Sequence, residues 1–304
     1  MALATQVPPS LLLPEFVNLP FNSSEMPPEY ATEIKAGKVD LRKLAISLVE
    51  RKRQFQNRWK RDDDENAIEA PETFPKSCDE VELVSFFPEQ YIDSLFDKGQ
   101  LNMHQTGESR GLTQRVIRTK AENSMIGIKL EPEPDTNPAA PMHFLRPKYG
   151  LVNFLKPCGV KVNPNRLLIY GELMIVYNDD VKLRSMYSYG DSLSTYCHYM
   201  AKDLKEYVEP RPMTEFAPPQ KNDTWDVRYV EAQIWGPIQL QDIKEFRIPK
   251  ERTDLLEKLK KAGKPVYAYS RENMINCDFH MEESEIGISR GEQLFAPAQQ
   301  TAAH

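Results

Sequence analysis

The sequence predicts an α+β protein, and two features of its 304 residues carry that prediction. Segments rich in β-branched and aromatic residues follow one another in the second half of the chain, with turn-forming residues between them. Segments with apolar residues at helical spacing lie mainly before and after these strands instead of alternating with them. We therefore expect clustered strands with helices around them. We divide the chain into residues 1–35, 36–69, 70–270 and 271–304.

Residues 1–35 contain prolines at positions 8, 9, 14, 20, 27 and 28, among small polar residues. Proline fixes the backbone φ angle and lacks an N–H donor, so it interrupts both helices and sheet ladders. We expect an extended arm here. The first residues also lack a positively charged region, and their prolines break the short apolar run, so we expect no Sec-type export signal.

Residues 36–69 hold a predicted helical extension. From Asp40 onward, apolar residues recur at intervals of three, four and seven, with arginine and lysine on the opposite face: Leu41, Leu44, Leu48, Phe55 and Trp59. Asp40 is placed to cap the first turn of this helix. The acidic run at 62–65 ends it, and we interpret that run as a solvated helix end, with a cation site as the alternative.

The central part, residues 70–270, is expected to carry the sheet. A helix is predicted near 89–96, and the proline-rich segment 131–141 is predicted to be a loop between a helical front and the strands. Further helices are predicted from Asp191 and at 254–262, with Gly263 in the left-handed C-cap position. Residues 294–304 are expected to be frayed. Strands are predicted at 149–155, 166–177, 182–189, 227–235 and 265–269.

The composition excludes several classes of function. The net charge is −6 and the isoelectric point is near 5.6, so the chain has no basic field to hold it on nucleic acid or on an anionic membrane. The most apolar stretch, 167–177, is shorter than the ~20 residues that span a bilayer. The four cysteines form no Cys-x-x-Cys pair, which indicates free thiols in a reducing, cytoplasmic compartment.

The usual nucleotide and metal motifs are absent from the sequence. No Gly-x-Gly-x-x-Gly, P-loop or His-Glu-x-x-His pattern occurs and the five histidines are scattered, so we expect no bound metal. Residues 107–111 do fit the Gly-x-Ser-x-Gly pattern of a hydrolase nucleophile elbow, with Ser109 as the nucleophile. That elbow requires a buried strand before it, whereas residues 97–106 are polar. A serine hydrolase is therefore the weaker alternative.

Three segments combine strand-like residues with groups that can bind or react. Residues 146–153, RPKYGLVN, place an arginine just ahead of a strand, with a glycine that lets a ligand approach the backbone. Residues 184–192, RSMYSYGDS, mix hydroxyls and aromatic rings along a strand. Residues 229–237, YVEAQIWGP, hold Glu231 inside an apolar strand, where a carboxylate is costly unless it is paired or faces a cleft.

The order arginine, serine, glutamate in these segments resembles the Arg-Ser-Glu class of ADP-ribosyltransferases. The wider phrasing is similar to a bacterial family of unnamed function related to that fold, with a counterpart for HQTGESRG at 104–111, and to secreted effector mono-ADP-ribosyltransferases of intracellular pathogens. The resemblance covers about residues 101–242. It implies a split β-sheet core with flanking helices, and transfer of ADP-ribose from the substrate NAD to a protein side chain, with arginine favoured.

The same resemblance assigns roles to individual residues. Glu231 would stabilise the positive charge that develops on the ribose, and Arg146 would bind phosphate or ribose oxygens through its fork of donors. A strand serine, Ser185 or alternatively Ser188, would orient the glutamate; the two lie three apart and face opposite sides of a strand. The other expected contacts to NAD are Tyr149, Gly150, Asn153, Ser188, Tyr189, Gly190 and Asp191, with Tyr187 as a further stacking candidate.

The acceptor side leaves two interpretations open. In the family pattern the glutamate is usually preceded at minus two by Glu or Gln, whereas this chain has Tyr229 there. Tyr229 and Gln233 are both candidates for acceptor binding, and a register with Glu231 first and Gln233 second exchanges the two roles. The expected partner is a protein substrate such as a host enzyme, reached by export through a specialised apparatus. A non-catalytic interaction module on the same fold is the alternative function.

Overall fold

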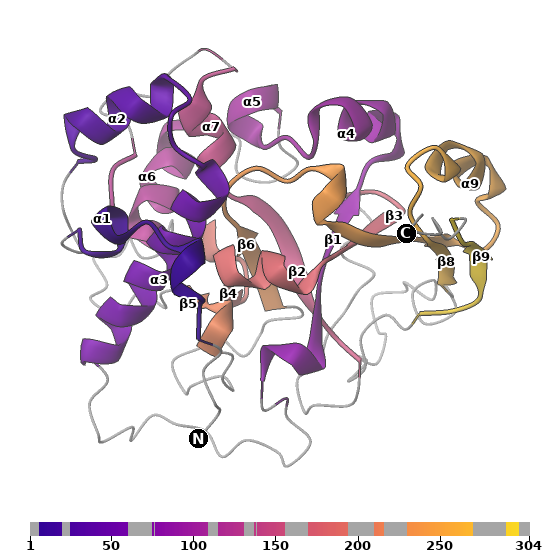
Figure 1. Ribbon diagram of the computed structural model, residues 1–304. Coiled ribbons are helices and arrows are strands. Elements are labelled where there is room, and N and C mark those ends of the chain that lie inside the picture. The colour runs from indigo at the N-terminus through magenta and orange to yellow at the C-terminus, as the bar shows by residue number, and fades with distance from the viewer. Residues whose placement is uncertain are drawn as a thin grey trace, which may run out of the picture.

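The structure is a computed structural model, and it describes residues 6–19, 25–59, 75, 77–108, 115–130, 137, 139–155, 170–193, 210–215, 230–269 and 290–297. These residues form one mixed sheet of nine strands in the order β5-β4-β6-β2-β1-β3-β7-β8-β9 (Figure 1). Neighbouring strands are antiparallel except β7 and β8, which are parallel. The predicted α+β class is confirmed. The strands are β1 (Val81–Phe87), β2 (Lys148–Phe154), β3 (Leu173–Tyr177), β4 (Ser185–Tyr189), β5 (Arg211–Pro212), β6 (Val230–Ile234), β7 (Ile243–Pro249), β8 (Val266–Tyr269) and β9 (Gln293–Phe295).

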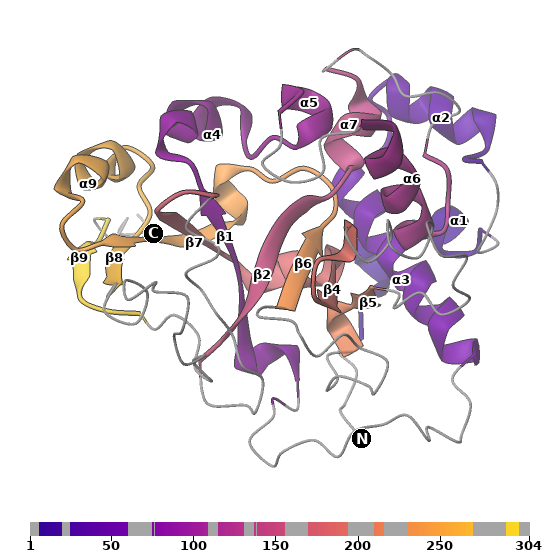
Figure 2. The same ribbon diagram turned by 180° about the vertical axis from the view of Figure 1, so that it is seen from behind.

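Most of the helices are gathered toward the two ends of this sheet, and α4 and α5 lie between the two groups (Figures 1 and 2). Helices α1, α2, α3, α6 and α7 lie together at the end that holds β4 and β5, whereas α9 lies beside β8 and β9. The described residues form three apolar clusters: one joins the first group of helices to the sheet, the largest lies on the other face of the sheet, and a small third one is made by side chains of β1, β2, β3 and β8. The helices are α1 (Pro14–Val17), α2 (Pro28–Lys35), α3 (Leu41–Trp59), α4 (Ile92–Lys98), α5 (Met103–Thr106), α6 (Arg115–Ile126), α7 (Pro141–Leu145) and α9 (Thr253–Lys260).

Strand β1 lies at the middle of the sheet, and the sequence analysis does not predict it. Its sequence VELVSFF is buried at every position except Glu82, so it lacks the alternation that marks a half-exposed strand. Its pairing changes partner half-way along: residues 81–84 pair with β2, and residues 84–87 pair with β3. The described strands form one continuous sheet. The feature that most resembles the predicted split of the sheet is the separation of β1 from β2 beyond Val84.

The expectation of an extended arm in residues 1–35 is corrected by the structure. Helices α1 and α2 begin with Pro14 and Pro28, and proline is well tolerated in a first helical turn because the N–H that it lacks would have no partner there. Phe16 and Ile34 are buried in the core shared with α3. The backbone N–H of Leu13 also donates to Ser47 Oγ of α3 at 2.8 Å. The described part of this segment, residues 6–19 and 25–35, is therefore packed against α3.

The predicted amphipathic helix of residues 36–69 is confirmed as α3. Asp40 Oδ1 accepts hydrogen bonds from the backbone N–H groups of Arg42 at 2.8 Å and Lys43 at 3.3 Å, so it caps the first turn as expected. Leu44 and Leu48 are fully buried on the inner side of this helix. Residues 60–74, including the acidic run, lie outside the described residues.

Other predicted elements occupy the expected positions. The strands predicted at 149–155, 227–235 and 265–269 correspond to β2, β6 and β8, and the helix predicted at 254–262 corresponds to α9. Gly263 follows α9 with a φ angle of 61°, which is the left-handed conformation expected at a helix C-cap.

Several boundaries differ from the prediction. The strand predicted at 182–189 begins with the end of a 3-10 helix (Asp179–Arg184), because the Asn178-Asp179-Asp180 sequence favours a turn. The strand predicted at 166–177 starts only at Leu173 within the described residues, and a 3-10 turn precedes α4 near 89–96. Residues 293–295 form an edge strand and are not frayed.

Some elements were not predicted, and some predictions lie outside the described residues. Helix α6 and strand β7 are absent from the sequence prediction. Most of the predicted loop at 131–141 and most of the helix predicted from Asp191 lie outside the described residues.

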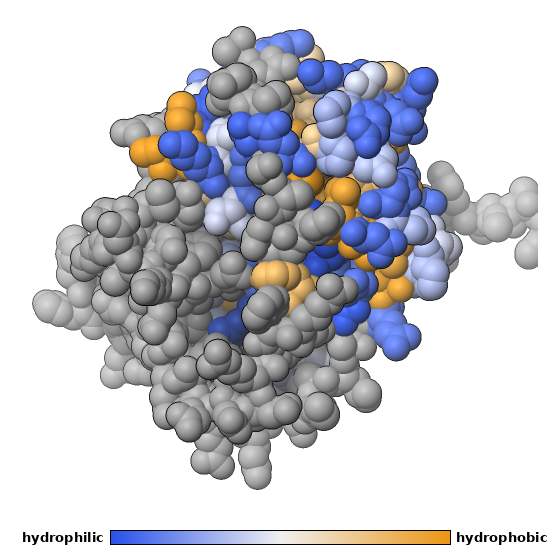
Figure 3. All heavy atoms as spheres, turned by 90° about the vertical axis from the view of Figure 1, so that its left-hand side faces the viewer, coloured by the Kyte–Doolittle hydropathy of each residue, from blue (hydrophilic) through white to orange (hydrophobic). Residues whose placement is uncertain are grey.

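On the face that carries the N-terminal helices, hydrophilic side chains are interspersed with smaller apolar areas (Figure 3). Among the helices that are described, none has the length and apolar character that a bilayer-spanning segment needs.

Candidate functional site

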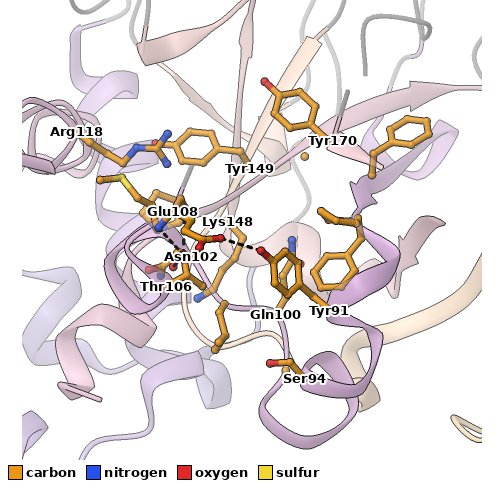
Figure 4. A pocket seen from close by; sticks show the side chains of 18 of the residues that line it. Tyr91, Ser94, Gln100, Asn102, Thr106, Glu108, Arg118, Lys148, Tyr149 and Tyr170 are labelled. Carbon is orange, nitrogen blue, oxygen red and sulfur yellow. Dashed lines mark hydrogen bonds between the residues drawn. The ribbon is translucent and has the colours of Figure 1, made fainter. Parts of the chain in front are cut away.

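A pocket of about 720 Å³ opens where β1 and β2 diverge. Beyond Val84, β1 pairs with β3 while the first residues of β2 pair with β6, so the two strands leave a gap between them. The wall of the pocket comes from the ends of both strands, from residues 88–108 around α4 and α5, and from side chains of α6, β6 and the segment after β4 (Figure 4). Its volume is typical of a small-molecule site.

Gly150 sets how closely the two strands approach at the edge of this pocket. A Cβ atom at this position would lie 2.4 Å from the carbonyl oxygen of Val84, so only glycine fits. Ser85 Oγ donates to the carbonyl of Tyr149 at 3.2 Å and ties the strands together there. Gly150 does line the pocket as expected, but the backbone that it lets approach is that of β1.

Glu231 is the central carboxylate of the pocket. It lies on β6 and is 6% exposed. Its Oε1 accepts hydrogen bonds from the backbone N–H of Ser192 at 3.2 Å, from the Ser192 hydroxyl, and from Gln233 Nε2 at 2.7 Å. Its Oε2 accepts none from the described residues, and Glu231 lines the pocket. One oxygen is therefore fixed by the protein, which leaves the other for a ligand.

Burial raises the pKa of Glu231 to about 7, and the nearby charge of Asp191 adds to this rise. The hydrogen bonds from Ser192 and Gln233 act in the opposite direction but are outweighed. Asp191 also lines the pocket, and its Oδ1 accepts from the backbone N–H of Leu193 at 3.0 Å. A carboxyl group with a pKa near neutrality is placed to exchange protons or to hold a charge at physiological pH.

Strand alternation decides which serine accompanies Glu231. Ser188 lies directly opposite Glu231 across the β4–β6 ladder, so both side chains are on one face of the sheet. Ser188 Oγ accepts from Gln233 Nε2 at 3.0 Å, and that nitrogen also donates to Glu231. Ser185 is on the other face, where its Oγ donates to the carbonyl of Val181 at 2.8 Å. The expectation that Ser185 orients the glutamate is therefore corrected in favour of Ser188.

Arg146 does not line the pocket, contrary to its expected role. It is fully buried, and its Nη1 donates to Glu122 Oε2 and to Asn123 Oδ1, each at 3.2 Å. A buried guanidinium needs a charged partner, and α6 supplies one here. The position of Arg146 just ahead of β2 does not determine where its side chain points. The predicted convergence of Arg146, Ser185 and Glu231 on one cavity is wrong.

Five further residues expected to contact NAD do not line the pocket: Asn153, Tyr187, Ser188, Tyr189 and Gly190. Asn153 donates to Glu82 Oε2 at 3.0 Å, toward the far end of β2. Tyr187 and Tyr189 pack edge to face with ring centroids 5.9 Å apart, in the core on the face opposite to Glu231. The carbonyl of Gly190 accepts a hydrogen bond from the Ser188 hydroxyl at 3.0 Å.

The two acceptor candidates have different outcomes. Gln233 is fully buried and holds Glu231, as described above, so the structure gives it an orienting contact and no exposure to an acceptor. Tyr229 lies outside the described residues.

Tyr149 lines the pocket and is held by a second buried carboxylate, and its contact with NAD stays a prediction. Its hydroxyl donates to Glu122 Oε1 at 3.3 Å, and His104 Nε2 lies 2.9 Å from Glu122 Oε2. Burial alone would raise the pKa of Glu122, but the hydrogen bond from His104 and the charges of Arg146 and Arg118 keep that pKa below its usual value. The ring of Tyr149 is thereby anchored to an ionised group.

Arg118 of α6 is one of several pocket residues that the sequence analysis misses. Its guanidinium carbon lies 5.1 Å from the centroid of the Tyr149 ring (Figure 4). A signal for it exists in the sequence: Arg118, Ala121, Glu122 and Met125 are buried at helical spacing, which places two charged residues on an inward face. Such charges at core positions indicate a site or a buried ion pair.

The rim of the pocket is aromatic and acidic. The hydroxyl of Tyr91 donates to Glu108 Oε2 at 2.8 Å, linking the turn before α4 to the segment after α5 (Figure 4). Tyr170 is partly exposed on the other side. Helix α5 occupies the place where a nucleophile elbow would require a strand, and Ser109 itself lies outside the described residues. The structure therefore gives the hydrolase alternative no support.

The comparisons with known proteins leave the site to be interpreted from its own geometry. No protein-family model matches the chain, and no curated protein matches it either. In the described residues no group of three or more histidine, cysteine, aspartate or glutamate side chains is arranged to hold a metal ion.

Proposed function

We propose that this protein is a mono-ADP-ribosyltransferase that uses NAD as its substrate and Glu231 as its catalytic carboxylate. The observation that carries the proposal is the state of Glu231: a buried strand carboxylate that lines a ligand-sized pocket, with one oxygen held by Ser192 and Gln233. The resemblance of the YVEAQIWGP segment to the Arg-Ser-Glu class points to the same residue. We also propose that the chain has the fold of these transferases.

The chemistry follows from the charge that the reaction creates. The bond between the nicotinamide nitrogen and ribose C1′ breaks, and its electron pair leaves with nicotinamide. Positive charge then develops on the ribose, until a nucleophilic atom of the acceptor bonds to C1′ and its proton passes to water. A fixed carboxylate stabilises that charge more strongly in the transition state than in the ground state, which accelerates the step. Glu231 Oε2 is the atom we assign to this contact.

The surroundings of Glu231 suit a nucleoside ligand. Tyr149 and Tyr170 offer aromatic surface for a heterocyclic ring, and the apolar residues Phe86 and Leu193 also line the pocket. The acceptor is a protein side chain, and the acidic rim that includes Glu108 favours a basic one such as arginine. On the resemblance alone, we also propose that the protein is secreted into a host cell and that its target is a host enzyme.

The test is to incubate the purified chain with NAD and to measure nicotinamide release by chromatography, with and without a cell lysate. We expect release that depends on the protein, and transfer of labelled ADP-ribose to lysate proteins. Absence of both nicotinamide release and NAD binding would instead support the non-catalytic interaction module. Binding without release in either condition would contradict the transferase proposal while keeping the pocket as a nucleotide site.

Ser188 and Ser185 form a matched pair, because they lie on one strand and face opposite sides. We expect Ser188→Ala to reduce nicotinamide release by about tenfold, since Gln233 loses one of the contacts that hold it against Glu231. Ser185→Ala removes a buried hydrogen bond to a carbonyl and is expected to lower the melting temperature without changing release per folded molecule. Equal losses of release in both variants would contradict the assignment.

A further inference from the structure

Gln100 is a buried amide in the wall of the pocket. It follows α4 and is 8% exposed (Figure 4). Its backbone N–H donates to the carbonyl of Ile238 at 3.0 Å, and a Cβ atom on the preceding Gly99 would lie 2.0 Å from that carbonyl oxygen. The backbone at Gln100 is therefore held close against the segment that follows β6.

Tyr177 of β3 determines which end of this amide is left for a ligand. Its hydroxyl lies 2.5 Å from Gln100 Oε1 and 2.8 Å from Ser85 Oγ. A separation of 2.5 Å belongs to an O–H···O hydrogen bond and is too short for N–H···O, so the amide oxygen faces Tyr177. Burial raises the pKa of Tyr177, which keeps the proton on the donating hydroxyl. Within the described part of the chain, Gln100 Nε2 donates to no acceptor.

The neighbouring amide of Asn102 is already used by the protein. Its Nδ2 donates to the carbonyls of His143 at 2.6 Å and Arg146 at 3.2 Å. Its Oδ1 accepts from the backbone N–H groups of His104 at 3.0 Å and Gln105 at 3.3 Å. Asn102 therefore shapes this wall, whereas Gln100 keeps the two N–H donors of its amide for a ligand.

The apolar surface that accompanies Gln100 suits a flat, uncharged ring. Leu101 and Met103 follow it in the pocket wall, and Phe87 lines the pocket from the end of β1. The rings of Phe87 and Tyr91 pack edge to face with centroids 6.5 Å apart. Aromatic and aliphatic side chains bind the faces of a planar ring, and a neutral donor adds direction without requiring a charge on the ligand.

The geometry points to Gln100 as a recognition residue for a nucleobase, to which it donates a hydrogen bond at an acceptor on the edge of the ring. That acceptor is a ring nitrogen or a carbonyl oxygen. Tyr177 is a positioning residue, because it holds the amide from the face of the sheet opposite to Glu231. The inference goes beyond the proposed function, since a base held by Gln100 needs no reaction at Glu231.

The test measures binding of adenosine and uridine to the full chain by calorimetry, together with deaza analogues of adenosine that each lack one ring nitrogen. We expect Gln100→Met to weaken adenosine binding by about five- to tenfold, the effect of one lost hydrogen bond. One deaza analogue should bind more weakly than adenosine to the parent protein by a similar factor, and Gln100→Met should abolish that difference. Tyr177→Phe should reduce the same difference to about threefold or less, which a loss of stability alone would not do.

Gln293→Met is the matched control, since it removes an exposed glutamine from β9, and it is expected to leave every affinity unchanged. If Gln100→Met weakens uridine binding and not adenosine binding, the acceptor is a carbonyl oxygen and the inference holds. A Gln100→Met variant that binds both nucleosides as tightly as the parent protein overturns it, as does a parent protein that binds neither.

A second variant keeps the test decisive if Gln100→Met does not fold, as judged by circular dichroism. Gln100→Glu retains the oxygen that Tyr177 contacts and removes the N–H donors, so it should lose nucleoside affinity by a similar factor. Unchanged affinity in a folded Gln100→Glu variant would overturn the inference. Neither nucleoside contains the bond to nicotinamide, so these results do not depend on the transferase activity, which can fail separately.

Discussion

Replacing Glu231 by glutamine is expected to reduce nicotinamide release from NAD by at least about 10³-fold. Glutamine has the same shape, and its oxygen can accept the hydrogen bonds that Ser192 donates to Glu231. It cannot supply the negative charge that stabilises the developing positive charge on the ribose. The measurement is the initial rate of nicotinamide release at saturating NAD for the parent protein and the variant.

The control for this substitution is Asp93→Asn, which removes a carboxylate from an exposed position of α4. We expect its rate to match that of the parent protein. A Glu231→Gln variant that is folded and retains more than about a tenth of the parent rate would exclude Glu231 as the residue that stabilises the reacting sugar.

The same substitution is expected to stabilise the fold above pH 7 by up to about 3 kcal/mol. The pKa of Glu231 is raised by burial from its usual value near 4.5 to about 7, so the folded chain binds a proton that the unfolded chain has lost between these pH values. Stability of the parent protein therefore falls as the pH rises from about 4.5 to 7. Glutamine carries no charge at any pH and avoids this loss.

The measurement is urea denaturation of both proteins at pH 4.5 and at pH 8. We expect the stabilities to be similar at the lower pH and the variant to be the more stable at the higher pH. A variant that is less stable than the parent at pH 8 would show that the ionised carboxylate is well accommodated, and the raised pKa of Glu231 would be wrong. Glu231→Gln would then lower both the activity and the stability of the protein.

The sequence was informative where a residue broke its local pattern. Glu231 stands out because a carboxylate in an apolar strand needs a partner or a cleft, and it is found beside the pocket. The choice between Ser185 and Ser188 required the register of β4 on β6, which fixes the face of each side chain. Periodicity alone identified two opposite faces but could not say which one carries the glutamate.

Long-range packing explains what the sequence did not reveal. Arg146 precedes a strand, but its direction depends on Glu122, which lies 24 residues earlier on a helix that was not predicted. The pocket depends on the change of pairing partner at Val84. This change could not be predicted, because β1 has no alternating pattern that identifies it as a strand. The proline-rich N-terminus is helical because its prolines occupy first turns and Phe16 reaches the core. Each of these features depends on contacts between distant segments.

The most direct test of the claim that Glu231 lies beneath the reacting sugar is a titration of its carboxyl carbon by ¹³C NMR, assigned with Glu231→Gln. The titration is repeated with a carbocyclic NAD analogue that cannot be cleaved. We predict a midpoint near pH 7 in the free protein, and a lower midpoint with the analogue because its cationic nicotinamide favours the ionised carboxylate. A midpoint in the ordinary range for glutamate that does not respond to the analogue would contradict the claim.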